Sequence, residues 1–339
     1  MPPDWSPPRP SAIRALWPQA LALLVIAAVS LFIGRYPGPF WTPPGLLWQD
    51  DLAARVVWSL RLPRVVAASL LGMSLSGAGI VLQTVFRNPL VEPGFLGVSQ
   101  GAAFGAALAI LGLGAGASPL AIEVSAMLFA LAGLAISYAV ARRLHFGGWV
   151  LRLVLGGIAV SALFSAGVGI IKYLADPFAQ LPAITFWLLG GLSGITWSAV
   201  LHLLPFVLPG LTLVVALRWR LNLLSLQDET AFSLGSSLGR ERALLLLGAV
   251  AAAAAVTAVG GIVGWIGLMV PHLARRLYGA DSRLAVPASL LMGGSFAIIC
   301  DDLARTLFAG EIPLGIVTSL AGALGFVFLL SRVTLRVPK

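Results

Sequence analysis

Long uninterrupted apolar runs recur along this chain of 339 residues, beginning with "ALALLVIAAVSLFIG" at 20–34. A helix that crosses a bilayer needs about 20 such residues, whereas barrel strands would alternate over about ten residues. The composition agrees: 59% of the residues are hydrophobic and 10% are charged, against about 25% charged residues in soluble domains. Because only helices and closed barrels satisfy their backbone inside lipid, the sequence predicts an all-α polytopic membrane protein.

The apolar runs predict a single transmembrane domain over residues 1–339. The run 243–277 is too long for one span at about 1.5 Å per residue, and arginines flank both of its ends. We therefore expect two spans with a break at "VGG", 259–261, because glycine tolerates tight turns. The first apolar run is interpreted as a retained helix and not a cleaved signal peptide. The ten predicted spans are residues 13–34, 63–84, 94–114, 119–141, 150–171, 197–217, 243–259, 261–277, 286–305 and 313–331.

The distribution of basic residues predicts the orientation. With the N-terminus inside, sixteen Arg and Lys residues fall on the cytoplasmic side and six on the outer side. Cytoplasmic loops carry an excess of Lys and Arg, so both termini are predicted to be cytoplasmic. The short apolar segment 181–192 then forms an outer half-helix after the fifth span, since it is too short to cross. The six outer basic residues are Arg35, Arg55, Arg61, Arg64, Lys172 and Arg305.

Several kinds of chemistry are not expected, because the sequence lacks the motifs that they need. No G-x-x-x-x-G-K-[ST] motif occurs, and neither of the two lysines, Lys172 and Lys339, follows a glycine. The chain is therefore not expected to bind ATP through a P-loop. His145, His202 and His272 lie in different segments, whereas a catalytic zinc site needs about three protein ligands together. We expect no metal site, no enzymatic activity and, because the net charge of +9 is concentrated in cytoplasmic loops, no nucleic-acid partner.

Charged residues near the membrane are few. Asp301 and Arg305 are four residues apart, so they are predicted to pair on one helix face. No carboxylate lies in the middle of a predicted span, as a proton-coupled carrier would require. A path powered by another subunit is therefore favoured over a secondary transporter, which remains the alternative from a different class.

The segment "FRNPLVEPG", 86–94, contains two prolines that interrupt the chain between the second and third spans. Arg87, Asn88 and Glu92 are expected to satisfy backbone groups that this break leaves free. Glycines within the spans are interpreted as sites of close helix packing. These are Gly72, Gly77, Gly79, Gly101, Gly105, Gly156, Gly157, Gly260, Gly261, Gly264 and Gly267.

Three long segments are similar to one known family. They are "RLPRVVAASLLGMSLSGAGIVLQTVFRNPLVEPGFLGVSQGAAFGA" at 61–106, "GGIVGWIGLMVPHLARRLYGADSRLAVPASLLMGG" at 260–294 and "CDDLARTLFAGEIPLGIVTSLAGALGFVFLL" at 300–330. They resemble the iron-chelate and vitamin B12 permease family of binding-protein-dependent ABC importers, and the similarity runs from about residue 20 to residue 333.

The resemblance implies a bacterial inner-membrane permease with ten helices per subunit. It implies a homodimer with the path at its axis, two ATP-binding subunits beneath it and a periplasmic substrate-binding protein above it. ATP and Mg would be bound by the ATPase subunits, so no cofactor is expected in this chain. The implied substrate is a metal chelate, with haem or a ferric siderophore as our prediction, cobalamin next, and molybdate-type oxyanions after that.

The segment "LQDETAFSLG" between the sixth and seventh spans resembles the family's coupling helix, which docks into the ATPase subunit. Acids at a helix N-terminus favour the helix dipole, and glycine is enriched just past helix ends. The apolar side chains of the segment would supply the contact. The residues assigned to coupling are Asp228, Glu229, Thr230, Ala231, Phe232, Leu234 and Gly235.

Two further sites rest on the resemblance. Arg61, Arg64 and Arg305 match positions at which the family receives acidic residues of the binding protein, and they would form a basic rim on the outer face. Residues His145, Phe146, Gly147 and Gly148 lie where the family places an inner gate, although "HFGG" departs from the family's pattern of small hydroxyl residues.

Overall fold

The computed structural model describes residues 16–235, 237–308 and 310–331. Within these residues the secondary structure is helical, apart from an isolated antiparallel bridge between Ile33 and Trp41. The prediction of an all-α membrane protein is therefore confirmed.

A helix lies in each of the ten predicted spans. Six helices, α6, α7, α9, α12, α14 and the continuous segment Asp51–Val85 that ends in α4, are long and apolar enough to cross a membrane. The number of spans at ten stays a prediction, because α2, α5, α13 and α15 are shorter. The bounds are α2 Trp17–Ser30, α4 Leu62–Val85, α5 Val98–Leu113, α6 Pro119–Arg143, α7 Trp149–Leu174, α9 Trp197–Ala216, α12 Leu238–Gly260, α13 Ile266–Tyr278, α14 Ser282–Thr306 and α15 Leu314–Ser331.

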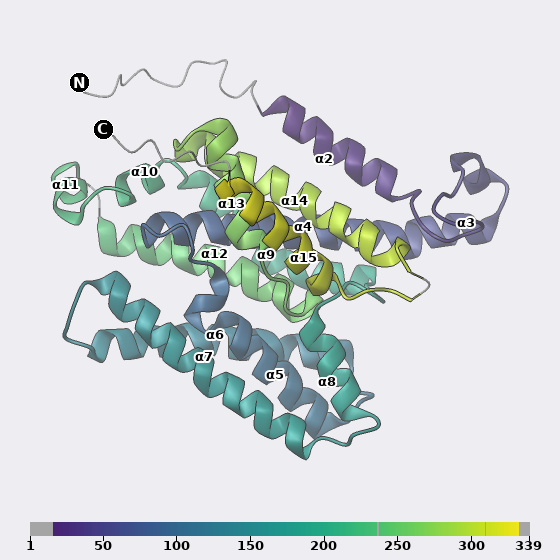
Figure 1. Cartoon of the computed structure of the whole chain (residues 1–339), viewed down its shortest axis with the longest axis horizontal. Coiled ribbons are helices and arrows are strands. Elements are labelled where there is room, and N and C mark those ends of the chain that lie inside the picture. The colour runs from purple at the N-terminus through teal and green to yellow at the C-terminus, as the bar shows by residue number, and fades with distance from the viewer. Residues whose placement is uncertain (1–15, 236, 309, 332–339) are drawn as a thin grey trace.

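Short elements occupy the loops at the two ends of these helices. A 3-10 turn η1 (Pro44–Trp48), helix α3 (Asp51–Arg55) and a π-helical turn η2 (Val56–Arg61) lead directly into α4, and η3 (Pro93–Leu96) precedes α5. Helix α8 (Gln180–Leu189) lies where the half-helix was predicted. Helices α10 (Arg220–Leu224) and α11 (Asp228–Ser233) lie at the opposite end of the molecule from α3 (Figure 1).

The run 243–277 is broken at its glycines. Helix α12 ends at Gly260, and Gly261 adopts a φ of 67°, a conformation that glycine reaches without steric cost. A Cβ at Gly261 would also overlap the carbonyl oxygen of Trp187. Helix α13 begins only at Ile266, five residues after the predicted start of that span, because Gly261–Trp265 form an extended turn that ends with Trp265 at φ 71°.

Helix α4 forms the centre of the larger group of helices. It packs against α14, α12, α13 and α9 (Figure 1). Close approach depends on glycine: a Cβ at Gly72 would overlap the carbonyl oxygen of Gly293 in α14, and a Cβ at Gly79 would overlap that of Gly267 in α13. The interpretation as packing sites is confirmed for these glycines, since lipid supplies no hydrophobic drive and helices associate through close contact. It is wrong for Gly264, where a Cβ would meet no atom within 4 Å.

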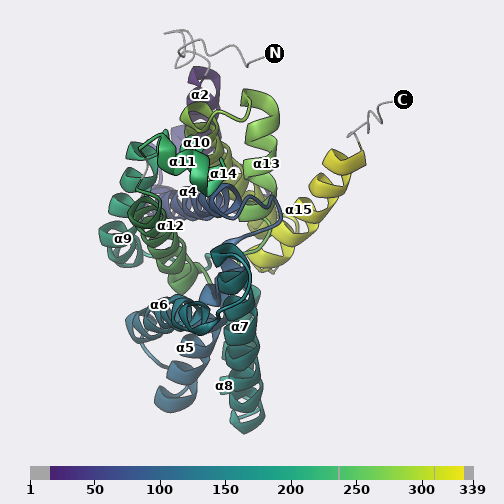
Figure 2. The same cartoon turned by 90° about the vertical axis from the view of Figure 1, so that its left-hand side faces the viewer.

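A second group contains α5, α6 and α7, which pack on one another, with α8 against α5 (Figure 2). Helix α6 and, less extensively, α5 join this group to α12, while α2 packs on α14 in the first group. The result is a molecule with one polar end around α3 and another around α10 and α11, and each end contains a predicted site.

Candidate functional site

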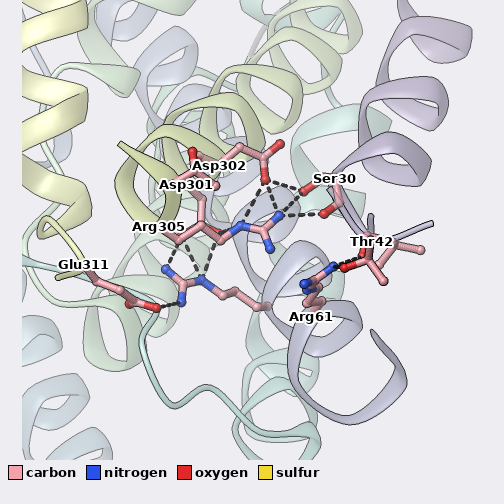
Figure 3. A network of polar contacts seen from close by, with 10 residues as sticks. Ser30, Thr42, Arg61, Asp301, Asp302, Arg305 and Glu311 are labelled. Carbon is pink, nitrogen blue, oxygen red and sulfur yellow. Dashed lines mark hydrogen bonds and ion pairs between the residues drawn. The ribbon is translucent and has the colours of Figure 1, made fainter. Parts of the chain in front are cut away.

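The outer site is built from the start of α4 and the end of α14, which lie side by side. Arg61 donates through Nη1 to the carbonyl oxygen of Leu31 at 3.0 Å and to Thr42 Oγ1 at 2.9 Å. Its side chain is thereby held under the loop that follows α2 (Figure 3).

Arg64 and Arg305 are both paired with carboxylates. Arg64 meets Asp301 through Nε–Oδ2 at 2.9 Å and Nη2–Oδ1 at 3.0 Å, a bidentate pair, and its Nη1 meets Glu311 Oε1 at 2.8 Å. Arg305 pairs with Asp302 and also donates to the carbonyl oxygen of Ser30 at 2.6 Å (Figure 3).

This arrangement confirms one expectation and corrects another. The predicted pair of Asp301 with Arg305 is present, with Oδ2–Nε at 3.9 Å, although each side chain also has a closer partner, Arg64 for Asp301 and Asp302 for Arg305. The three arginines do not form an exposed rim: Arg61 is 6% exposed and Arg305 is 9% exposed. Burying charge is costly unless it is paired, so the chain supplies their partners itself.

The arginines instead form the lining of a hollow. A cavity of about 430 Å³ is lined by Arg35, Arg61, Arg64, Arg305 and Glu311, among others. The carboxylates that contact these side chains are Asp301, Asp302 and Glu311. Four guanidinium groups against three carboxylates leave the hollow basic, which suits an acidic group entering from outside.

The inner site is centred on α11. Gly235 has a φ of 79° and its N–H donates to the carbonyl oxygen of Phe232 at 2.9 Å, so it ends the helix as predicted for glycine past a helix end. Asp228 and Glu229 form the first turn, where negative charge is favoured. Thr230 accepts from the hydroxyl of Ser233 through its carbonyl oxygen at 2.8 Å.

Asp228 anchors α11 to two other elements. Its carboxylate accepts from Arg242 of α12 at 2.7 and 2.9 Å, and from Arg87, just beyond α4, at 2.6 Å. The hydrogen bonds from Arg242, followed by those from Arg87, lower the pKa of Asp228 to about 2. The carboxylate therefore stays ionised throughout the physiological range, and it holds α11 against the ends of α4 and α12.

The exposed face of α11 is smaller than predicted. Ala231 is fully buried within the chain, so it cannot contribute to a contact with another subunit. Phe232 and Leu234 are 75% and 58% exposed, respectively. Of the three apolar residues assigned to the contact, Phe232 and Leu234 therefore remain available for it.

The break between α4 and α5 differs from its prediction in part. Asn88 caps it locally, since its Oδ1 accepts from the N–H of Leu90 at 2.9 Å. Arg87, at φ 50°, points away and donates to the carbonyl oxygen of Leu226 as well as to Asp228. Glu92 lines a cavity of about 350 Å³ together with Ser99, Gln100 and other residues. Arg87 therefore connects the segment between α4 and α5 to α11, and its side chain does not satisfy backbone groups within that segment.

The predicted gate segment forms the turn between α6 and α7. His145 and Phe146 are exposed, Gly147 has a φ of 67°, and Gly148 precedes the first residue of α7. The structure does not bring this turn together with the outer arginines, and its role as a gate stays a prediction.

Arg242 and the polar residues of the Glu92 cavity are site residues that sequence reasoning missed. Arg242 follows the acidic segment closely in the sequence, but nothing local distinguishes it from Arg240 as the partner of Asp228. Ser161 of α7 also lines that cavity, and its hydroxyl is buried with no hydrogen-bond partner among the described residues. Among those residues no group of three or more His, Cys, Asp or Glu side chains could hold a metal ion.

These features define a class: a polytopic helical membrane protein with one cluster of ion pairs at each end of the central helix α4. The chain belongs to the FecCD transport family, which its sequence matches over residues 22–332. It is a permease of the metal-chelate type of ABC importer, a multi-pass protein of the bacterial inner membrane. The secondary-transporter alternative is therefore wrong.

The names of similar proteins refer to several different substrates. The chain is 42% identical to a probable iron chelatin transport permease of Helicobacter pylori over 92% of this chain and 97% of that protein. It is 40% identical to the hemin transport permease HmuU of Yersinia pestis, covering 92% and 94%. It is 36% identical to the molybdate import permease MolB of Haemophilus influenzae, covering 91% and 93%.

A solved structure has the same fold. It is an inward-facing metal-chelate type ABC transporter with a TM-score of 0.87 and 35% identity, and the match covers 95% of this chain and 100% of that one.

Proposed function

We propose that this chain imports an iron chelate, haem or a ferric siderophore, across the inner membrane. Family membership over 22–332 is the observation that carries the proposal. Two relatives with iron-related names are 42% and 40% identical to it, against 36% for the molybdate and a vitamin B12 permease. Cobalamin and molybdate-type oxyanions remain the alternative substrates.

The chain would act as one half of a homodimer, with two ATP-binding subunits on the side of α11. Phe232 and Leu234 offer the apolar contact that an ATPase groove would cover, and Asp228 holds α11 to α4 and α12. Arg87 contacts Asp228 and begins the break that leads to the Glu92 cavity, so it would carry a displacement of α11 to the polar interior of the chain. ATP and Mg bind to the partner subunits.

A periplasmic binding protein would deliver the chelate at the opposite end. The basic hollow lined by Arg35, Arg61, Arg64 and Arg305 would accept an acidic side chain of that protein. Charge complementarity of this kind mainly increases the association rate and fixes orientation.

Substrate identity is tested by ATP hydrolysis of the reconstituted importer in liposomes. The permease, its ATPase and its binding protein are combined with haem, a ferric siderophore, cobalamin or molybdate. We expect stimulation by haem or the siderophore. Stimulation by cobalamin or molybdate alone would replace the iron-chelate proposal with that alternative.

A further inference from the structure

A groove between α6, the start of α7 and the start of α12 lies at the end of the molecule that also carries α11. It has a volume of about 640 Å³, within the range of pockets that hold small ligands. Its walls are mostly apolar, and include Leu134, Leu246 and Leu247. A groove with such walls on a membrane helix bundle suits a hydrocarbon chain.

One charged side chain, that of Arg242, lines this groove. Arg242 is only 8% exposed and has an Nε with no hydrogen-bond partner among the described residues. Its two Nη atoms are taken by Asp228. The guanidinium lies 5.8 Å from the ring of Trp149, which also lines the groove. Because Nε has almost no exposed surface, Arg242 offers the groove its positive charge and not a free donor.

The charge around the groove favours an anion. Asp228 supplies one negative charge to two arginines, Arg87 and Arg242, which leaves the cluster positive. Arg142 lies 6.0 Å over the ring of Tyr138, another lining residue.

The first turn of α12 adds backbone donors. Gly239 lines the groove, and the N-cap residue of this 23-residue helix, Ser237, makes no side-chain hydrogen bond to the helix N-terminus. Helix N-termini bind phosphate groups through free N–H groups and the dipole.

We propose that this groove binds one anionic phospholipid, with the phosphate beside the charged Arg242 side chain and the first turn of α12 and an acyl chain along the leucines. The site is at the arginine-rich end, which the positive-inside rule assigns to the cytoplasm. Basic pockets between helices on that side bind anionic head groups. Since Arg242 also holds Asp228, a bound lipid contacts the residue that positions α11.

The test measures lipid retained by the purified full-length chain in detergent, by native mass spectrometry with phosphatidylglycerol. Arg242→Gln removes the positive charge, and Ala243→Phe fills the groove at a lining residue without replacing the arginine. We expect each variant to retain about tenfold less phosphatidylglycerol, because the first loses a charge-assisted contact and the second loses the pocket. Arg240→Gln, which removes the same charge from the same turn outside the groove, should reduce retention less than twofold.

Three controls distinguish an anionic phospholipid from other possible occupants of the groove. Phosphatidylcholine should not displace the bound lipid, and millimolar inorganic phosphate should leave it in place. Equal retention in the Arg242→Gln and Ala243→Phe variants, or full displacement by inorganic phosphate, would overturn the lipid site. So would rapid disulfide formation between two Ala243→Cys chains in membranes, because a second copy would then cover the groove.

Discussion

At the scale of single residues, Phe232 carries the predicted contact with the ATPase. Its side chain is 75% exposed on α11. Burying an unpaired polar group in an apolar interface costs roughly 2–7 kcal/mol, and burying an unpaired ion costs more. We expect Phe232→Asp to abolish co-purification of the ATPase subunit while the permease stays folded.

The control for this substitution is Phe178→Asp, the same chemical change at a residue that is 92% exposed in the loop before α8. It should leave co-purification unchanged. Normal assembly and transport by the Phe232→Asp variant would remove the assignment of α11 to coupling.

Asp228 gives a prediction about pH. Its pKa is lowered from 3.8 to about 2 in the folded chain, first by the hydrogen bonds from Arg242. A carboxylate with a lowered folded pKa stabilises the fold above its ordinary pKa, and that contribution is lost as the pH falls through the folded value. Hydrogen exchange of α11, corrected for its intrinsic pH dependence, should therefore be constant from pH 7 to about 5 and faster only below about pH 4.

The Asp228→Asn variant should show fast exchange of α11 at every pH, because the amide cannot hold two arginines. An unchanged exchange rate in that variant at pH 7 would show that packing of Ala231, and not the ion pairs, keeps α11 in place.

At the scale of helices, the contact between α4 and α14 depends on Gly72. A Cβ there would overlap the carbonyl oxygen of Gly293, and overpacking of this kind costs about 1–3 kcal/mol. We expect Gly72→Ala to lower the thermal unfolding temperature of the permease in detergent. Gly112→Ala in α5, where a Cβ meets no atom within 4 Å, should leave that temperature unchanged or raise it.

The positions of the helices could largely be predicted from the sequence, but the pairing of side chains could not. Length and hydrophobicity are local properties, so every predicted span contains a helix and the break falls at Gly260. The pair Arg64–Asp301 joins residues 237 positions apart, and nothing local distinguishes Asp301 from Asp302 as its partner. The burial of Ala231 could not be predicted either, because it depends on how α11 packs against helices that are distant in the sequence.

At the scale of the whole molecule, the arginine asymmetry fixes an orientation that labelling can check. Ser237 lies at the α11 end and Pro43 lies before η1 at the other end. The native Cys300 is buried. A cysteine at Ser237 should react with an impermeant maleimide only from the cytoplasm, and one at Pro43 only from the periplasm. Periplasmic labelling at Ser237 would invert the assignment of both contact sites.

The outer hollow is the proposed contact site for the binding protein. Charge reversal at Arg61 or Arg305 is a poor test, because both are buried and hydrogen-bonded within the chain. Reversal would disrupt their contacts with Ser30, Thr42 and Asp302. Glu311 offers a cleaner one: its side chain is 46% exposed, and it offsets Arg64 from the open side at 2.8 Å.

If the hollow accepts an acidic side chain, Glu311→Gln makes it more basic and should tighten binding of the periplasmic protein at low salt. Exposed pairs contribute about 0–1 kcal/mol, so the gain should be about two- to fivefold, and screening should remove most of it at high salt. The measurement is affinity of the reconstituted importer for its binding protein at two ionic strengths. Asp51→Asn, the same charge change at an exposed residue of α3, should have a smaller effect. Weaker binding by the Glu311→Gln variant would mean that Glu311 itself contacts a cation of the partner, and the hollow would not be the acidic receptor.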